Sequence, residues 1–304
     1  MSGAAYIAGD WGTSNLRLFL CAGDDRVLAT ASGPGAAESR GHFAEVFDGL
    51  TAAWRKDNGA LPAVLCGMAG SAFGWVEAPY LPCPEEVASV ASSLATPRAG
   101  VHIVPGMRCS NPLGAPDVLR GEETQLLGAL AQAPALATGR HLVCLPGTHS
   151  KWVSLHDGVV LDFLTVPTGE LFKLLCDHSV LVREPTTRVE HRAAEFERGL
   201  AESARHAEVP LLHRLFQARS LRLDKQLSPE GAPSWMAGLL IGSEVGGALP
   251  LFAAATTVHV IGAPALCDLY RAALAKHGRR AECIAGDSAS LAGLARVRAA
   301  LPEN

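Results

Sequence analysis

Two short segments of the chain combine glycine, threonine and serine in the same way. Each follows an apolar run that predicts a strand, and each leads into a second β-prone run. A tight hairpin turn of this composition offers backbone N–H groups and hydroxyls to an anion. Two such turns, one in each half of the chain, predict a phosphate chain gripped between two similar domains. The predicted phosphate-binding residues are Gly12, Thr13, Ser14 and Asn15 in the first turn and Gly147, Thr148, His149 and Ser150 in the second.

Charged residues flank the first turn on both sides. Asp10 ends the strand before the turn, where a carboxylate could hold a hydrated Mg²⁺ against phosphates and so take part in catalysis. The alternative is an acid that caps the hairpin as an Asx-turn. Arg17, on the strand after the turn, could face substrate or phosphate, or it could form an ordinary cross-strand ion pair.

Two adjacent acids, Glu122 and Glu123, lie near the start of a segment with helical period, 119–131. At about 100° per residue, Glu123 falls within the stripe of leucines and Glu122 lies at its edge. An acid on the apolar side of a helix could act as a catalytic base whose pKa is tuned by partial burial. The alternative is that both acids simply complement the helix dipole. The sequence does not decide which of the two would be the base.

The elements that must position these residues follow the same order in both halves. Each half predicts a three-stranded meander followed by mixed helices and strands, which is typical of a duplicated α/β domain with a cleft between the copies. We expect domains at 1–135 and 136–304. Segments 71–84 and 105–117, rich in turn residues, are expected to be loops. In the first half we expect strands at 5–11, 16–21, 27–32, 63–66 and 101–104 and helices at 43–54 and 119–131; in the second half, strands at 141–145, 151–155, 159–164, 258–261 and 282–285 and helices near 169–177, 192–206, 234–249, 265–277 and 288–300.

Composition narrows the class of partner. The chain has 304 residues, 48% of them hydrophobic, which is enough for two domains with their own cores. Its net charge is -4 and it has no Lys/Arg block, so we expect no nucleic-acid partner and no membrane partner. Eight cysteines without a C-x-x-C pair indicate reduced thiols, and no secretory signal is evident, so we expect a cytoplasmic protein. Segment 245–265 is apolar but is interrupted by glycines and a proline, which favours a helix end, a turn and a strand of a soluble protein over a membrane-spanning helix.

Residues 9–17 resemble the first phosphate motif of the actin, hexokinase and Hsp70 superfamily of ATP-using folds. Residues 145–152 resemble its second phosphate motif, and residues 260–263 its adenosine-binding turn, which implies adenosine contacts at Gly262 and Ala263. The resemblance therefore implies two ribonuclease-H-like (actin-like ATPase) domains with a nucleotide cleft between them. Pro146 stands where many relatives have Asp. The missing acid favours transfer to a sugar hydroxyl over hydrolysis.

Narrower combinations resemble the 2-dehydro-3-deoxygalactonokinase family from residue 6 to beyond residue 290. They are Gly67 to Ser71 with Gly74-Trp75 and Ala78 to Leu81, Arg120 to Gln125, the Pro-Gly-Thr-His run before Lys151-Trp152, and Thr168 to Leu171. This resemblance implies a kinase that moves the γ-phosphoryl of ATP to the 6-hydroxyl of 2-dehydro-3-deoxy-D-galactonate in galactonate breakdown. The implied cofactors are ATP and Mg²⁺.

Substrate contacts follow from the same resemblance. Gly70, Ser71 and Trp75 form a loop where backbone can approach a sugar acid and an indole can wall it; the alternative is a tight glycine loop with a core tryptophan. Thr168 and Glu170 could bind the sugar acid or could simply begin a helix. The substrate carboxylate needs a cation. The candidates are Arg17, Arg108 and Arg120.

Other functions remain open at this point. One is a phosphohydrolase of the exopolyphosphatase type, which shares the fold and a Glu-Glu helix start. Another is a kinase for a related 2-keto-3-deoxy sugar acid, and a third is a nucleotide-binding regulator without catalysis. Loop 75–84 could form the interface of a homodimer or could wall the site.

Overall fold

The computed structural model describes residues 3–182, 191–252 and 256–302. The chain divides into two compact units. Unit 1 comprises residues 1–140, 155–163 and 285–304, and unit 2 comprises residues 141–154 and 164–284. The predicted boundary at 135/136 lies close to the first passage from unit 1 to unit 2, whereas the C-terminal segment returns to unit 1. None of the helices in the described ranges is both long and apolar enough to cross a membrane.

The first sheet carries the predicted meander and then turns parallel. Its strand order is β3-β2-β1-β4-β8-β7, with β1 antiparallel to β2 and parallel to β4. Strand β4 is in turn parallel to β8, so the carboxyl ends of β1, β4 and β8 meet at one edge of the sheet. The strands are β1 (Ala4–Trp11), β2 (Asn15–Ala22), β3 (Val27–Pro34), β4 (Ala63–Gly67), β7 (Ala95–Arg98) and β8 (Val101–Ile103).

Another sheet repeats this order with five strands from the second half and the short strand β6 from the first half at its edge. Its order is β15-β14-β11-β12-β13-β6, and β11 is parallel to β14, as β1 is to β4. The same meander and the same parallel neighbour confirm the predicted duplication. The strands are β6 (Glu85–Glu86), β11 (Arg140–Leu145), β12 (Ser150–His156), β13 (Val159–Val166), β14 (Thr257–Gly262) and β15 (Arg280–Ala285).

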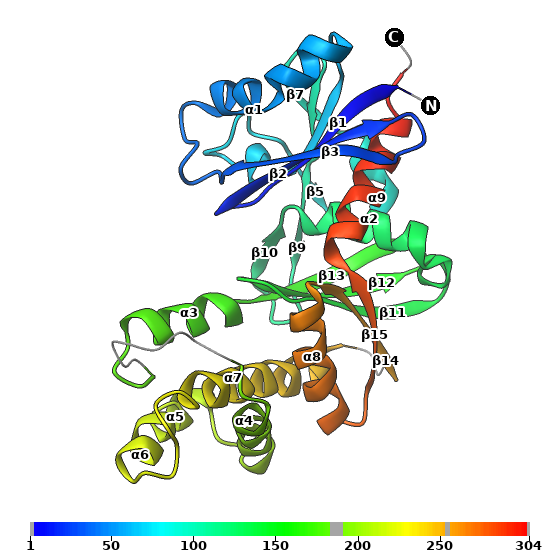
Figure 1. Ribbon diagram of the computed structural model, residues 1–304. Coiled ribbons are helices and arrows are strands. Elements are labelled where there is room, and N and C mark those ends of the chain that lie inside the picture. Colours follow the sequence, from blue (N-terminus) through cyan, green and yellow to red (C-terminus); the bar gives the residue numbers. More distant parts are fainter. Residues whose placement is uncertain (1–2, 183–190, 253–255, 303–304) are drawn as a thin grey trace. The chain divides into compact units, whose positions relative to one another are not determined.

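The helices pack on these sheets and on one another, and Figure 1 shows their arrangement within each unit. Apolar cores lie under α1 in unit 1, and around α4, α7 and α8 in unit 2. The helices are α1 (Phe43–Asn58), α2 (Glu122–Gln132), α3 (Thr168–His178), α4 (Ala193–Arg205), α5 (Leu211–Arg214), α6 (Gln217–Leu223), α7 (Ala232–Ala248), α8 (Pro264–Lys276) and α9 (Gly286–Ala299), with 3₁₀ turns at Met68–Gly70, Val87–Ser92, Pro134–Ala137 and Leu249–Leu251.

Several expectations for segment 71–119 are wrong. The expected loops contain β5 (Tyr80–Pro82), β9 (Gly106–Ser110) and part of β10 (Pro116–Leu119), which form a small sheet of their own. These strands are short and are held by partners distant in sequence, so local patterns do not reveal them. The expected helix at 119–131 begins only at Glu122, because Leu119 pairs with Met107 in β10 and Gly121 has a φ of +104°.

Helices α2 and α9 of unit 1 cross with their backbones almost in contact, and they lie side by side in Figure 1. A Cβ on Gly128 of α2 would lie 1.8 Å from the carbonyl oxygen of Ala289. A Cβ on Gly293 of α9 would lie 2.0 Å from the carbonyl oxygen of Thr124. Each helix thus needs a glycine where the other passes. This crossing fixes the helix that carries Glu122 and Glu123.

We expect Gly128→Ala to destabilise the protein, because the helices must separate to admit the methyl group. Overpacking of this kind costs about 1–3 kcal/mol of unfolding free energy, which urea unfolding would measure. Gly49→Ala in the exposed face of α1 is the matched control, since nothing lies within 4 Å of its Cβ. There the same change should stabilise the helix by about 0.5–1 kcal/mol. Equal effects of the two changes would contradict the close crossing.

Candidate active site

The carbonyl groups of the first predicted phosphate turn hydrogen-bond to a neighbouring segment of unit 1. The carbonyl oxygens of Gly12 and Thr13 accept the backbone N–H groups of Ala36 (3.0 Å) and Ala37 (3.1 Å). A Cβ on Gly35 would lie 2.3 Å from the Thr13 carbonyl oxygen, so only glycine fits there. The C=O and N–H groups of a trans peptide point in opposite directions. The N–H groups of Thr13 and Ser14, which share peptide planes with these carbonyls, therefore point away from residues 35–37.

The second predicted turn, in unit 2, is built in the same way. The carbonyl oxygen of Thr148 accepts the N–H of Glu170 (2.9 Å), and a Cβ on Gly169 would lie 2.3 Å from the carbonyl oxygen of Gly147. Gly147, Thr148 and His149 are exposed. In each unit, therefore, a glycine just after the third meander strand packs on the carbonyl side of the turn and leaves the opposite side for an anion.

Asp10 and Arg17 face each other across β1 and β2, as the cross-strand alternative predicts. An Arg17 Nη donates to Asp10 Oδ2 at 2.6 Å, and the other Nη pairs with Asp287 in the first turn of α9. The second Asp10 oxygen lies 3.9 Å from the Cys66 thiol at the end of β4. Asp10 thus keeps a partly exposed carboxylate at the sheet edge, while two acids already share the charge of Arg17.

The two glutamates at the start of α2 have different environments. Glu123 is fully buried; it accepts the Gly121 N–H (2.6 Å) and the Thr124 hydroxyl (2.9 Å). Glu122 is only partly buried and accepts the Arg120 N–H (3.0 Å). The apolar position predicted for Glu123 is confirmed. Both acids also serve N–H groups at the helix start, as the helix-dipole alternative expects.

Burial raises the pKa of Glu123 to about 7, and the neighbouring charge of Glu122 adds to the effect. Burial also raises the pKa of the Cys66 thiol, and the charges of Asp10 and Glu123 raise it further. These groups therefore influence one another at one place, where the ends of β1 and β4 meet the start of α2. Gly67 and Gly121 approach closely there, since a Cβ on Gly121 would lie 3.5 Å from Gly67 Cα.

Arg120 joins the glycine loop after β4 to the start of α2. Its Nη2 donates to the Ala78 carbonyl (2.8 Å), its Nε donates to the Tyr80 hydroxyl (3.4 Å), and its guanidinium stacks on the Tyr80 ring. Its Nη1 is buried without a partner among the described residues, and a Cβ on Gly70 would lie 2.7 Å from it. The structure thus brings Gly70 and Arg120 together, as a substrate site at this loop requires.

The other predicted substrate residues lie in different surroundings. Ser71 is nearly buried at the end of the 3₁₀ turn. Trp75 packs on the core of unit 1, with its ring 6.3 Å from Trp11, which agrees with the core-tryptophan alternative. Thr168 and Glu170 lie in unit 2; the Glu170 carboxylate is 2.7 Å from His149 Nε2. The structure thus places these two residues beside the second phosphate turn.

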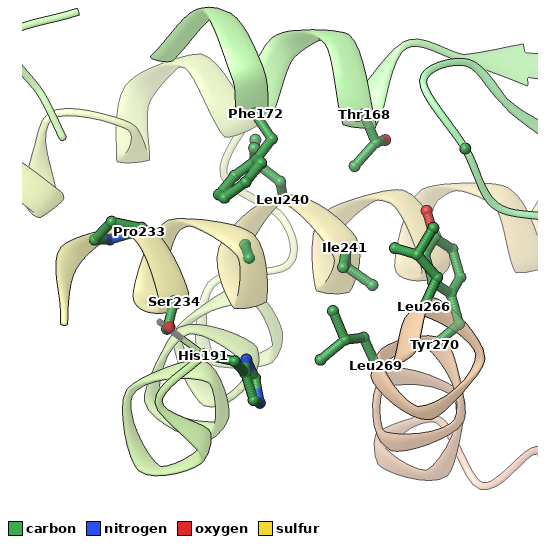
Figure 2. Close-up of a pocket in the computed structure, with 13 residues that line it drawn as sticks. Thr168, Phe172, His191, Pro233, Ser234, Leu240, Ile241, Leu266, Leu269 and Tyr270 are labelled. Atoms are coloured by element: carbon green, nitrogen blue, oxygen red, sulfur yellow. The ribbon is translucent and has the colours of Figure 1, made fainter. Parts of the chain in front are cut away.

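An apolar pocket of about 240 Å³ lies in unit 2 next to Gly147. Figure 2 shows side chains from α3, α7 and α8 on its walls. Apart from Thr168, these side chains were not predicted from the sequence, because apolar helix positions give no sign that they face a cavity rather than a core. Gly262 and Ala263, predicted to bind adenosine, precede α8; a Cβ on Gly262 would lie 3.2 Å from Pro146. The pocket is lined by Gly147, Thr168, Gly169, Phe172, His191, Pro233, Ser234, Ala237, Leu240, Ile241, Leu266, Leu269 and Tyr270.

The fold has relatives of known structure. The chain superposes with a TM-score of 0.51 on the activator of 2-hydroxyisocaproyl-CoA dehydratase from Clostridium difficile, solved with bound ADPNP. The match covers 97% of this chain and 95% of the other at 11% identity, so it shows the fold alone. A crystal structure from Sinorhizobium meliloti, of a protein proposed to be a 2-dehydro-3-deoxygalactonokinase, matches with a TM-score of 0.87, 37% identity and 98% coverage of both chains.

Sequence relatives extend this comparison. A probable 2-dehydro-3-deoxygalactonokinase of Rhizobium meliloti is 38% identical over 311 residues, and the 2-dehydro-3-deoxygalactonokinase of Escherichia coli is 35% identical over 298 residues. Each match covers 97% of this chain and 97% of the relative.

The duplicated α/β fold is that of two ribonuclease-H-like domains of the actin-like ATPase type, as the sequence predicts. Residues 10–297 match the family of 2-keto-3-deoxy-galactonokinases. The chain belongs to this family.

The raised pKa of Glu123 predicts a pH-dependent contribution to stability. A folded-state pKa near 7 against an ordinary 4.5 means that the folded state holds this proton more tightly, so stability falls as pH rises between these values. Glu123→Gln removes this titration. Urea unfolding should show that the free energy of unfolding falls between pH 5 and pH 8, and that this fall is larger in wild type than in the variant by up to about 3 kcal/mol. Glu45→Gln, an exposed acid of α1, should behave as wild type; a Glu123→Gln variant that also does so would refute the burial effect.

Proposed function

We propose that the protein transfers the γ-phosphoryl of ATP to the 6-hydroxyl of 2-dehydro-3-deoxy-D-galactonate, in the breakdown of galactonate. The observation that carries the proposal is the match to relatives bearing this name, at 35–38% identity over 97% of the chain. Phosphoryl transfer has a loose transition state, so the protein mainly has to position the reactants and stabilise charge. The described residues offer groups for each of these tasks. A kinase of this kind works in the cytoplasm, where ATP is available.

Each turn, taken within its own unit, is a phosphate-binding element for ATP. Each presents backbone N–H groups on the side opposite to its anchored carbonyls, together with the hydroxyls of Thr13, Ser14 and Thr148. The apolar pocket beside Gly147 receives the nucleobase, because a purine is a flat group that gains free energy from burial against leucine and phenylalanine side chains. Adenosine contacts at Gly262 and Ala263, which precede α8, stay a proposal that rests on the resemblance.

Asp10 would hold Mg²⁺. The donor fits: its carboxylate is partly exposed, and its Oδ1 lies toward the Cys66 thiol rather than a cation. No group of three or more candidate metal ligands occurs among the residues that the structure describes. This agrees with Mg²⁺, which commonly takes one or two carboxylates and fills its other positions with phosphate oxygens and water. When bound, the ion would neutralise charge that develops on the phosphates.

Glu122 accepts the proton of the attacking hydroxyl. Glu123 has no exposed surface, and both of its oxygens already accept hydrogen bonds, so a sugar hydroxyl cannot reach it without rearrangement of the helix start. Glu122 is adjacent and partly exposed. Glu123 then has a positioning role. It caps the helix and holds the start of α2, with Glu122, at the sheet edge.

Arg120 binds the carboxylate of the sugar acid. Arg17 already faces two acids, and Arg108 is exposed, whereas one Nη of Arg120 has no partner in the described part of the chain. A buried unpaired donor is costly, and an incoming carboxylate would remove that cost. Gly70 and Ser71 would line the same site, with Trp75 behind them. For Thr168 and Glu170, contact with the sugar acid stays a proposal that rests on the resemblance alone. A homodimer likewise stays a proposal.

A coupled ADP-release assay against a panel of 2-keto-3-deoxy sugar acids tests the function. We expect ADP release only when a sugar acid is present, with 2-dehydro-3-deoxy-D-galactonate preferred over its gluconate epimer. Preference for another member of the panel would change the substrate and keep the kinase. ATP loss without any sugar acid would instead indicate a phosphohydrolase, and ATP binding without turnover would indicate a regulator.

Substitution of the carboxylates separates their roles. Glu122→Gln should lower kcat by about 10²- to 10⁴-fold, the usual contribution of a general base, with little change in KM for ATP. Asp10→Asn should abolish transfer while leaving the fold intact, because the carboxylate that would hold Mg²⁺ is lost. Glu123→Gln is the matched control for Glu122→Gln and should cost much less. Equal mild losses in both glutamate variants would exclude a general base at this helix, and unchanged turnover of Asp10→Asn would exclude the metal role.

A further inference from the structure

A carboxylate that the sequence analysis did not single out lies behind the second phosphate turn. Glu244, on α7, is only 5% exposed. Its Oε1 accepts the indole N–H of Trp152 at 2.8 Å, and its Oε2 accepts the Tyr270 hydroxyl at 2.6 Å. The side chains of Thr168 and Ser150 also hydrogen-bond to it. Trp152, Tyr270 and Thr168 thus fill most of the roughly four acceptor positions of an ionised carboxylate.

These donors come from three different elements, and each element borders the proposed nucleotide site. Ser150 is the last residue of the second phosphate turn, and its hydroxyl also lies 2.8 Å from that of Tyr270. Thr168 begins α3 and precedes Gly169, which packs on the Gly147 carbonyl. Tyr270, on α8, lines the apolar pocket together with Thr168 and Gly147. Glu244 itself does not line the pocket.

The physical cost of this arrangement argues against a purely space-filling role. Burial raises the pKa of Glu244, and the hydrogen bonds from Thr168, Tyr270 and Trp152 oppose that effect. An apolar residue of similar size would avoid the desolvation of a charge. A charged acceptor, however, can orient several donors at once in a way that an apolar side chain cannot.

We propose that Glu244 is a positioning residue for nucleotide binding: its carboxylate locks β12, the start of α3 and α8 together, and so sets the second phosphate turn and the adjoining pocket wall in their binding geometry. The inference rests on the proposed function in that the pocket takes the nucleotide. The ligand class that depends on Glu244 is then the nucleoside di- or triphosphate, whereas the sugar-acid contacts proposed at Gly70, Ser71 and Arg120 in unit 1 do not involve it.

Nucleotide affinity and steady-state kinetics of Glu244→Gln test this proposal. Glutamine keeps the shape but loses acceptor capacity and places an NH₂ group against donors. We expect Kd for ADP, measured by titration calorimetry, and KM for ATP to rise about tenfold, while kcat falls less than threefold and KM for the sugar acid changes by a smaller factor than KM for ATP. Tyr270→Phe removes one donor and should shift the same two nucleotide constants in the same direction by a smaller factor; it carries the test if Glu244→Gln does not fold.

Val245→Ala is the matched control. Val245 is the next residue of α7 and is fully buried in the core of unit 2, outside the hydrogen-bond network. It should lower Tm but leave Kd for ADP within twofold of wild type. If Glu244→Gln and Tyr270→Phe lower Tm and likewise leave Kd for ADP within twofold, the network is only structural and the proposal is wrong. Because ADP binding needs no sugar acid, a wild-type protein that binds ADP without transferring phosphate would refute the proposed function and still allow this comparison.

Discussion

The candidate site depends above all on which way the peptide planes of two turns point. In each turn the carbonyl oxygens are drawn to a neighbouring segment, and a glycine whose Cβ would lie 2.3 Å from backbone atoms makes that approach possible. The donors on the opposite side are therefore oriented before any anion arrives, and binding need not order them. Gly35 and Gly169 hold this position in the two units, each shortly after the third strand of its meander.

The sheet topology explains why the charged groups of unit 1 gather. Parallel strands bring their carboxyl ends to one edge, so Asp10 on β1 meets Cys66 on β4, and Gly121 places the start of α2 beside them. Burial of Glu123, followed by the charge of Glu122, raises the pKa of Glu123 beside this edge. A site of this kind favours a metal cation together with the phosphates, because the ion offsets the repulsion between them.

The sequence predicted both meanders, the duplication and the apolar position of Glu123, since these follow from strand alternation, turn residues and helical period, which are local signals. It did not predict β5, β9 and β10, whose pairing depends on tertiary contacts, nor the apolar pocket. Glu244 was missed for a related reason: in the apolar helix α7 a single acid has no periodic partner, and its hydrogen-bond donors lie on β12, α3 and α8.

The two units use their acids differently. Pro146 is buried beside Gly262, so no carboxylate stands at the start of the second turn. Unit 2 instead keeps its acid, Glu244, inside the fold, where hydrogen-bond donors surround it. Unit 1 keeps Asp10 and Glu122 at least partly exposed. A carboxylate that orients backbone and a carboxylate that handles protons or metal need opposite environments, and the duplicated fold supplies one in each copy.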